Sequence, residues 1–190
     1  MARCGDVRPD TSPWLVAGVM GEIVARLMSG HRALKKMTSE PLLPETFAVG
    51  TFLVEGIVLT VHGIDEALTV LREVAPCVGD IRGEFNVHLD QWRAFRDDAS
   101  HVVDRTLRVP VARGAREDND SALNASTWGW EEGTLVVGYD SATDSIVTGS
   151  TSLSLGAAID LAKDIYGLVS TRVNEEHHKG NIPPPKAVVT

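Results

Sequence analysis

The stretch ETFAVGTFLVEGIVLTVHGIDEALTVLREVA, residues 45–75, decides the fold. Its first half is apolar on nearly every side, which is typical of a helix surrounded by other elements. Its β-branched residues and three glycines also suit a buried strand over a short window, but the length of the stretch favours a helix. We therefore predict a central helix over 45–75, with Gly56 and Gly63 as places where it can bend, that is stopped by Pro76.

A second helix is predicted before the central one, over residues 13–37, after a polar leader at 1–12. Ser12 and Pro13 supply an N-cap and a residue type favoured at the first helical position. Apolar residues then recur along one side, and Lys35 and Lys36 fall in the last turn, where cations suit the helix dipole. The Pro-punctuated linker SEPLLPE separates the two helices.

A third helix is predicted over residues 78–109, ending at Pro110. Apolar side chains recur along this stretch at spacings of four and seven, with Trp92 near the middle. The period then changes, because the short β-rich runs TLVVGY (134–139) and SIVTGS (145–150) flank the turn-forming DSATD. We expect a β-hairpin insertion over about 126–151, with STWGW (126–130) as a candidate third strand.

The segment 152–180 restores a period near 3.6 and ends at Gly180, in the place of a helix C-cap. The Pro-rich tail at 181–190 is expected to be extended or disordered. These elements predict a mainly α protein. We expect one domain over 13–180, built as an antiparallel four-helix bundle with a β-hairpin insertion between the third and fourth long helices.

The composition limits the function classes. A net charge of −8 argues against a general affinity for phosphate backbones, which normally needs a basic face. Cys4 and Cys77 are too few for a disulfide framework or a thiolate zinc site, so free thiols are expected. There is no apolar signal region before Pro13, and charged residues interrupt the apolar runs, so neither secretion nor a membrane span is expected. We predict a cytoplasmic location.

One stretch of the third helix, RDDASH at 96–101, has the residue types for catalysis. Asp97 and His101 are four residues apart and share a helix face, where a carboxylate can orient an imidazole. Arg96 lies about 140° around the helix from His101. The arginine and the histidine therefore need a neighbouring helix, a second subunit or a bend to converge on one substrate.

This stretch resembles the Arg-x4-6-His signature of HEPN-type helical proteins, in which a polar residue usually follows the arginine. Arg96, Asp97 and His101 occupy the three matching positions, and Asp104 follows three residues after the histidine. The helix order and the insertion before the last helix are also similar to these proteins. The spacing recurs at 26–31, 82–88 and 172–177, but only Arg96 is followed by an acidic residue or an amide.

The resemblance implies metal-independent endoribonuclease chemistry, usually with paired motifs across a dimer interface. His101 would transfer a proton as general acid or base, Arg96 would hold the phosphate, and Asp97 would orient the histidine. The predicted function is a HEPN-like endoribonuclease or toxin-like domain acting on RNA, without cofactor or metal. The alternative is a noncatalytic helical dimerisation or protein-interaction module that uses the same helix, with its charged residues forming a solvated face.

Two further readings of the sequence remain. A carboxylate-bridged metal site is disfavoured, because it needs Glu-x-x-His on two helices and only Glu175 to His178 supplies one. Glu55 and His62 share a face of the most apolar helix, where they can face a groove or pair with Arg26 or another helix, and a structural pair is expected rather than a catalytic one. A homodimer is also expected, because the helices carry more apolar surface than a slim bundle hides. An RNA substrate or a protein partner completes the predicted interactions.

Overall fold

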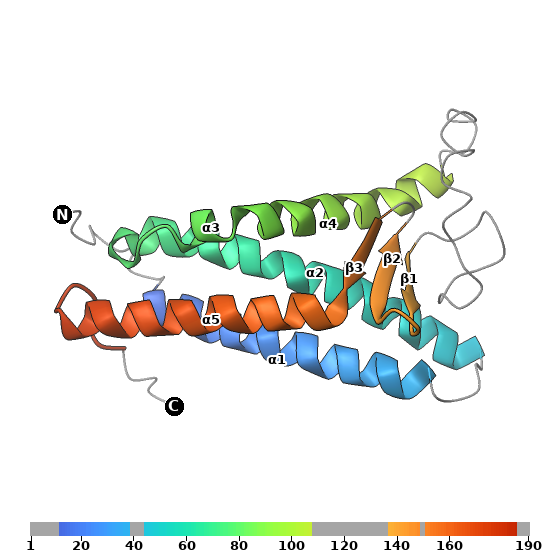
Figure 1. The fold of residues 1–190 in the computed structure, drawn as a ribbon, viewed down its shortest axis with the longest axis horizontal. Helices are drawn as coiled ribbons and strands as arrows, with labels where there is room; N and C mark the ends of the chain where they lie inside the picture. Colours follow the sequence, from blue (N-terminus) through green and yellow to red (C-terminus); the bar gives the residue numbers. More distant parts are fainter. Residues whose placement is uncertain (1–11, 39–43, 108–136, 149–150, 186–190) are drawn as a thin grey trace.

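The computed structural model describes residues 12–38, 44–107, 137–148 and 151–185. Side chains are described for residues 12–37, 53–97, 138–147 and 151–185. Within these ranges the protein is mainly helical, with a small three-stranded antiparallel sheet before the last helix (Figure 1). The prediction of a mainly α protein with a β element in this place is confirmed.

Four long helices dominate the described ranges, and consecutive long helices run in opposite directions (Figure 1). The sheet lies at one end of the molecule, beside the start of α5. The elements in chain order are α1 (Pro13–Thr38), α2 (Pro44–Val74), the short 3-10 helix η1 (Pro76–Val78), α3 (Ile81–Glu84), α4 (Asn86–Leu107), β1 (Val137–Asp140), β2 (Ser145–Thr148), β3 (Thr151–Ser154) and α5 (Leu155–His178).

Helix α2 is the central element, as its apolar sequence predicts. It packs against α1, α4, β1 and the short helices η1 and α3. Gly63 allows close packing and does not end the helix, because a Cβ atom there would lie 3.2 Å from Cδ1 of Ile23 on α1. On the other side of the same interface, a Cβ atom on Gly30 would lie 3.0 Å from Cγ1 of Ile57. Larger residues at these two positions would push α1 away from α2.

The predicted third helix is interrupted, so the expectation of one helix over 78–109 is wrong in its first part. Gly79 has a φ of 87°, a conformation that favours glycine and ends η1. Asp80 then caps α3 by accepting a hydrogen bond from the backbone N–H of Gly83. Phe85 separates α3 from α4, and its N–H bonds back to the carbonyl of Arg82. Local capping has overridden the longer apolar periodicity.

The three strands form a simple meander in the order β1-β2-β3. Val137 pairs with Thr148, and Thr148 also pairs with Thr151 across the second hairpin. The described residues contain a third strand that we did not predict. Residues 151–154 form β3, whereas the sequence pattern assigned 152–154 to the last helix, and the candidate strand at 126–130 lies outside the described residues. The sequence TSLS at 151–154, in which an apolar residue lies between polar ones, is compatible with a strand as well as with the start of a helix.

The segment after α5 is packed against the start of α1. Ile182 is only 2% exposed and belongs to the core. Nε1 of Trp14 donates a hydrogen bond to the carbonyl of Pro183 at 2.8 Å, and the Trp14 and His177 rings make an edge contact. The core therefore continues into the first residues of the segment that the sequence suggested as a tail.

A closed four-helix bundle is not confirmed. Helix α5 packs on α1, whereas α4 packs on α2, β2 and β3, and among the described residues α4 and α5 make little direct contact. Arg172 of α5 bridges to Glu84 of α3 at 2.7 Å, which joins the two sides at the end far from the sheet (Figure 1). Between α4 and α5 the fold stays open.

The structure also bears on two expectations from the sequence, the free thiols and the absence of a membrane span. Cys77 is disulfide-bonded, so the expectation of a free thiol is wrong for this residue. Cys4, the other cysteine of the chain, lies outside the described residues. Within the described ranges, no helix combines the length and the apolar character needed to cross a membrane.

Candidate functional site

The motif residues Arg96 and Asp97 lie on α4, which continues as a helix through position 101. Nε of Arg96 lies 3.2 Å from Oδ1 of Asp97, and the two side chains are 31% and 49% exposed. The carboxylate proposed to orient His101 thus pairs with its neighbouring arginine. The side chain of His101 lies outside the described residues, so its role stays a prediction.

Three charged residues near the motif are used to hold the fold together. The carboxylate of Asp65 on α2 accepts hydrogen bonds from Nε of Arg82 at 2.8 Å and from Arg93 on α4 at 2.5 Å. Burial acts to raise the pKa of Asp65, but the hydrogen bonds from Arg93 and Arg82 more than offset this and lower it below 3.8. The ion pairs of Asp65 therefore link α3 and α4 to α2.

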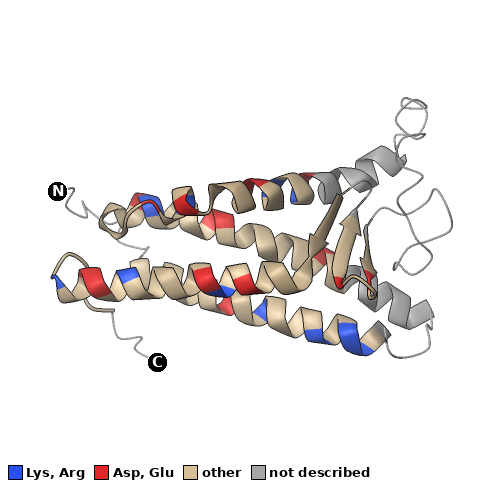
Figure 2. Ribbon diagram, viewed as in Figure 1, with Lys and Arg blue, Asp and Glu red and all other residues tan. Residues whose placement is uncertain are grey.

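The charged residues of α4 and α5 are mixed in sign. Figure 2 shows acidic and basic residues interspersed along the described parts of both helices. Neighbours on the same helix form ion pairs, such as Arg93 with Asp90 and Lys163 with Asp160. This pattern gives no continuous basic surface among the described residues of these two helices, which is what nonspecific binding to a phosphate backbone would use.

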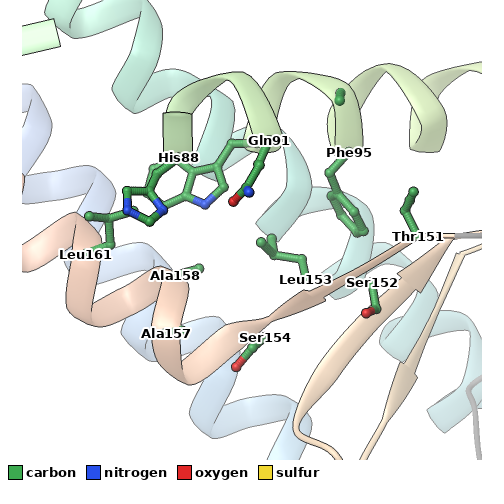
Figure 3. A pocket seen from close by; sticks show the side chains of 12 residues that line it. His88, Gln91, Phe95, Thr151, Ser152, Leu153, Ser154, Ala157, Ala158 and Leu161 are labelled. Carbon is green, nitrogen blue, oxygen red and sulfur yellow. The ribbon is translucent and has the colours of Figure 1, made fainter. Parts of the chain in front are cut away.

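A groove of about 550 Å³ opens where α4 and α5 separate (Figure 3). From α4, Trp92 and Phe95 contribute aromatic surface, while His88 and Gln91 contribute polar groups. The two aromatic residues are otherwise buried in the core, which fixes their positions. A groove of this size with aromatic walls and a few polar groups is the kind of place where proteins bind ligands.

The opposite wall of the groove consists of β3 and the first turns of α5 (Figure 3). Ala157, Ala158 and Leu161 come from α5, and the two alanines leave space that longer side chains would fill. Phe95 and Leu153 project into the groove from the two walls. Within the part of the chain whose side chains are described, the groove lining contains no aspartate, glutamate, lysine or arginine.

The turn between β1 and β2 is fastened to α1 by a cluster around Asp144. Oδ1 of Asp144 accepts a hydrogen bond from the hydroxyl of Tyr139 at 2.6 Å and lies 2.7 Å from Nε2 of His31. Nζ of Lys35 lies 3.1 Å from Oδ2. The backbone carbonyl of Asp144 also accepts the N–H of Leu155, the first residue of α5. One residue thus joins α1, the sheet and α5.

The contacts within this cluster shift the pKa values of the Asp144 carboxyl and the Tyr139 hydroxyl. Burial acts to raise the pKa of Asp144, while hydrogen bonds from Tyr139, His31 and Lys35 lower it to a net value below 3.8. Burial raises the pKa of Tyr139, and the adjacent Asp144 carboxylate raises it further. Tyr139 therefore stays protonated as a donor while Asp144 stays ionised as an acceptor.

The remaining sequence candidates are not gathered into a site. His62 pairs with Glu66 at 3.3 Å, and Glu55 is exposed, so the expected pairing of Glu55 with His62 does not form. Among the described residues, no three histidine, cysteine, aspartate or glutamate side chains lie close enough together to hold a metal ion.

Sequence reasoning missed both the groove and the Asp144 cluster. The groove exists because α4 and α5 make little direct contact in their described parts, and the spacing of apolar residues in the sequence does not predict how helices pack. For the cluster, the only local signal is the turn sequence DSATD, in which aspartate is a residue type that tolerates a positive φ; Asp144 has a φ of 52°.

A scan against models of protein families finds no match to this chain, and comparisons with curated proteins and with solved structures find no significant match either. The resemblance to HEPN-type proteins therefore rests on the 96–101 motif and the order of the helices.

Proposed function

We propose that the protein is a noncatalytic binding module whose groove between α4, β3 and α5 takes an uncharged, largely apolar ligand. The observation that carries this proposal is the lining, whose described residues combine Trp92, Phe95 and Leu153 with no aspartate, glutamate, lysine or arginine. In this view the predicted four-helix bundle is an open one, and the ligand covers the apolar surface that α4 and α5 leave apart.

The lining decides which ligands fit. A charged group moved from water into the groove would lose hydration without gaining a countercharge, which is costly. Apolar surface placed against Trp92, Phe95 and Leu161 gains about 25 cal/mol for each Å² removed from water. His88 and Gln91 are polar groups that can fix the orientation of a neutral ligand by hydrogen bonds.

A substitution that fills the groove tests whether the ligand binds there. With the neutral fluorophore N-phenyl-1-naphthylamine as the probe, the wild-type protein is expected to bind and increase its emission. Ala157→Trp should weaken binding about tenfold or more, because the indole occupies space that the alanine leaves open. Ala157 is exposed, so the substitution leaves the packed core unchanged. Fluorescence titration measures the effect.

The matched control is Lys163→Trp, which adds the same ring to an exposed position of α5 that does not line the groove. This variant should bind the fluorophore as the wild type does. Equal binding by the wild type and Ala157→Trp would show that the dye binds elsewhere, and the proposal would be abandoned.

A second candidate is the HEPN-like endoribonuclease or toxin-like RNA-acting domain. What supports it is the 96–101 motif on an unbroken stretch of α4, together with the partly exposed guanidinium of Arg96 beside the Asp97 carboxylate. An RNA phosphate would have to compete with Asp97 for that guanidinium. The resemblance gives His101 the proton transfer and Arg96 the phosphate.

The RNA-acting candidate predicts that His101→Ala slows RNA cleavage strongly. Wild-type protein should cut single-stranded RNA or transfer RNA without added metal, and the variant should lose about 100-fold in rate, the usual contribution of a general acid or base. Gel analysis of end-labelled RNA provides the measurement. His88→Ala, on the same helix but outside the motif, serves as the control. Intact RNA after incubation with wild-type protein would remove this candidate.

Two further predictions remain proposals. A homodimer is proposed from the apolar surface of the helices, of which Leu15, Leu59 and Val87 remain largely exposed. The cytoplasmic location also remains a prediction from the sequence. The disulfide bond of Cys77 weighs against it, because such bonds persist mainly in oxidising compartments.

A further inference from the structure

The groove runs along the edge of β3. All four residues of this strand line it, although successive side chains of a strand point to opposite faces of the sheet. What four consecutive residues share is the edge of the strand. One edge of β3 is paired with β2, and the sheet order β1-β2-β3 places no strand on its other edge within the described ranges.

The register identifies the backbone groups on that outer edge. In an antiparallel pair, alternate residues direct both their N–H and C=O groups toward the partner strand. The N–H of Leu155 bonds to the carbonyl of Asp144, which continues the β2–β3 register by one pair. Leu153, two residues earlier, therefore also faces β2. Ser152 and Ser154 face outward, toward the groove.

The outer edge thus offers a short series of hydrogen-bonding groups: the N–H and C=O of Ser152 and the N–H of Ser154. The carbonyl of Ser154, the residue before α5, is at the position that accepts the first hydrogen bond of a helix. Unpaired strand edges of this kind are templates for another strand. Here the template has an aromatic wall on α4 and a small-residue wall on α5.

We propose that the ligand of the groove is an extended, uncharged segment of another protein that adds to β3 as a fourth strand. The proposal rests on the proposed binding function and names its ligand. Backbone groups of the segment pair with Ser152 and Ser154, and its apolar side chains lie against Phe95 and Ala158. A β-strand partner explains why a groove with aromatic walls is bordered by peptide groups.

Charge favours a partner of different sequence over a second copy of this chain. The chain carries a net charge of −8, which disfavours bringing two copies together at this acidic side of α5, while a dimer through the exposed apolar residues of other faces remains compatible with it. Asp160 and Asp164 each lie three residues after a lining residue of α5, and α5 of a second copy would bring the same acids to the interface. A neutral segment matches the uncharged lining and meets no such repulsion.

Ser152→Pro tests the outer edge directly. The probe is the capped pentapeptide acetyl-Val-Thr-Val-Thr-Val-amide, whose binding to the wild-type protein is measured by isothermal titration calorimetry. Proline removes the outward N–H of Ser152 without removing a hydrogen bond to β2, and proline is tolerated on edge strands. We expect peptide affinity to fall about tenfold or more.

Two controls separate backbone pairing from other effects. Ser152→Ala keeps the backbone N–H and should bind the peptide within about twofold of the wild type. A peptide with an N-methyl group on its central valine should bind the wild-type protein about tenfold less well, because it lacks a donor on one edge. N-phenyl-1-naphthylamine should still bind to Ser152→Pro, since the walls of the groove are unchanged.

The outcomes distinguish this inference from the proposed function. If the wild-type protein binds the fluorophore but not the peptide, the groove takes a small molecule and the strand proposal is overturned. If it binds neither, the proposed function fails as well. If light scattering shows a wild-type dimer that Ser152→Pro converts to a monomer, a second copy occupies the edge, and the partner proposed here is wrong.

Discussion

Replacing Asp65 by alanine is expected to destabilise the protein by about 3–5 kcal/mol, the usual cost of removing one partner from a buried ion pair. The Asp65 side chain is only 6% exposed and accepts hydrogen bonds from Arg82 and Arg93. Without it, the largely buried Arg82 guanidinium keeps its charge and loses its acceptor. Urea unfolding followed by circular dichroism measures the change.

Asp65→Asn is the matched variant, because it keeps the shape and an oxygen acceptor but removes the charge. It should be destabilised less than Asp65→Ala.

The pKa of Asp65 is lower in the folded protein than the ordinary 3.8, so its ionisation stabilises the fold above that pH. This contribution is lost as the pH falls below 3.8 through the lowered value. Wild-type stability should therefore fall more steeply than that of Asp65→Asn below pH 3.8. An unfolding free energy for Asp65→Ala equal to that of the wild type would contradict the role assigned to this network.

Replacing Asp144 by alanine is expected to cost about 2 kcal/mol, mainly because the Tyr139 hydroxyl loses its acceptor inside the protein. Tyr139 is only 1% exposed, so water does not readily replace the carboxylate. The change also removes the partner of His31 and Lys35, and alanine is strained at a φ of 52°. Chemical denaturation gives the free energy, and hydrogen exchange at the sheet amides should increase.

Asp144→Asn separates charge from conformation, since asparagine tolerates the positive φ and keeps one oxygen acceptor for Tyr139. It should lose less stability than Asp144→Ala. The lowered pKa of Asp144 has the same consequence as that of Asp65: stability is present above 3.8 and is lost as the pH falls through the lower folded value. Unchanged sheet exchange in Asp144→Ala would mean that the cluster does not fasten the sheet to α1.

Local patterns predicted much of the fold because helices and hairpins depend on near neighbours in the chain. The N-cap and proline at 12–13 predicted the start of α1, and the apolar length of 45–75 predicted α2. The predicted turn at DSATD lies between β1 and β2. Where a strong local signal competed with a longer periodicity, as at Gly79 and Asp80, the local signal decided the structure.

The candidate sites were less accessible to sequence reasoning. Arg96 and Asp97 stood out because their residue types suit chemistry, yet they pair with each other across one helical step. The alternative interpretation placed the charged residues of this helix on a solvated face, but one of them, Arg93, pairs with Asp65, which lies 28 positions earlier in the chain. The groove residues are ordinary alanines, serines and aromatics, and they gain meaning only from the elements that face them.

The sequence by itself determined the approximate positions of the four long helices, that a β element comes before the last helix, and that α2 is central. These features follow from side-chain periodicity, turn residues and caps, which act over a few residues. Only the tertiary structure decided that α4 rests on α2 and the sheet while α5 rests on α1. That choice depends on contacts between distant segments, such as Asp65 with Arg93 and His31 with Asp144, and it leaves the edge of β3 facing an open groove.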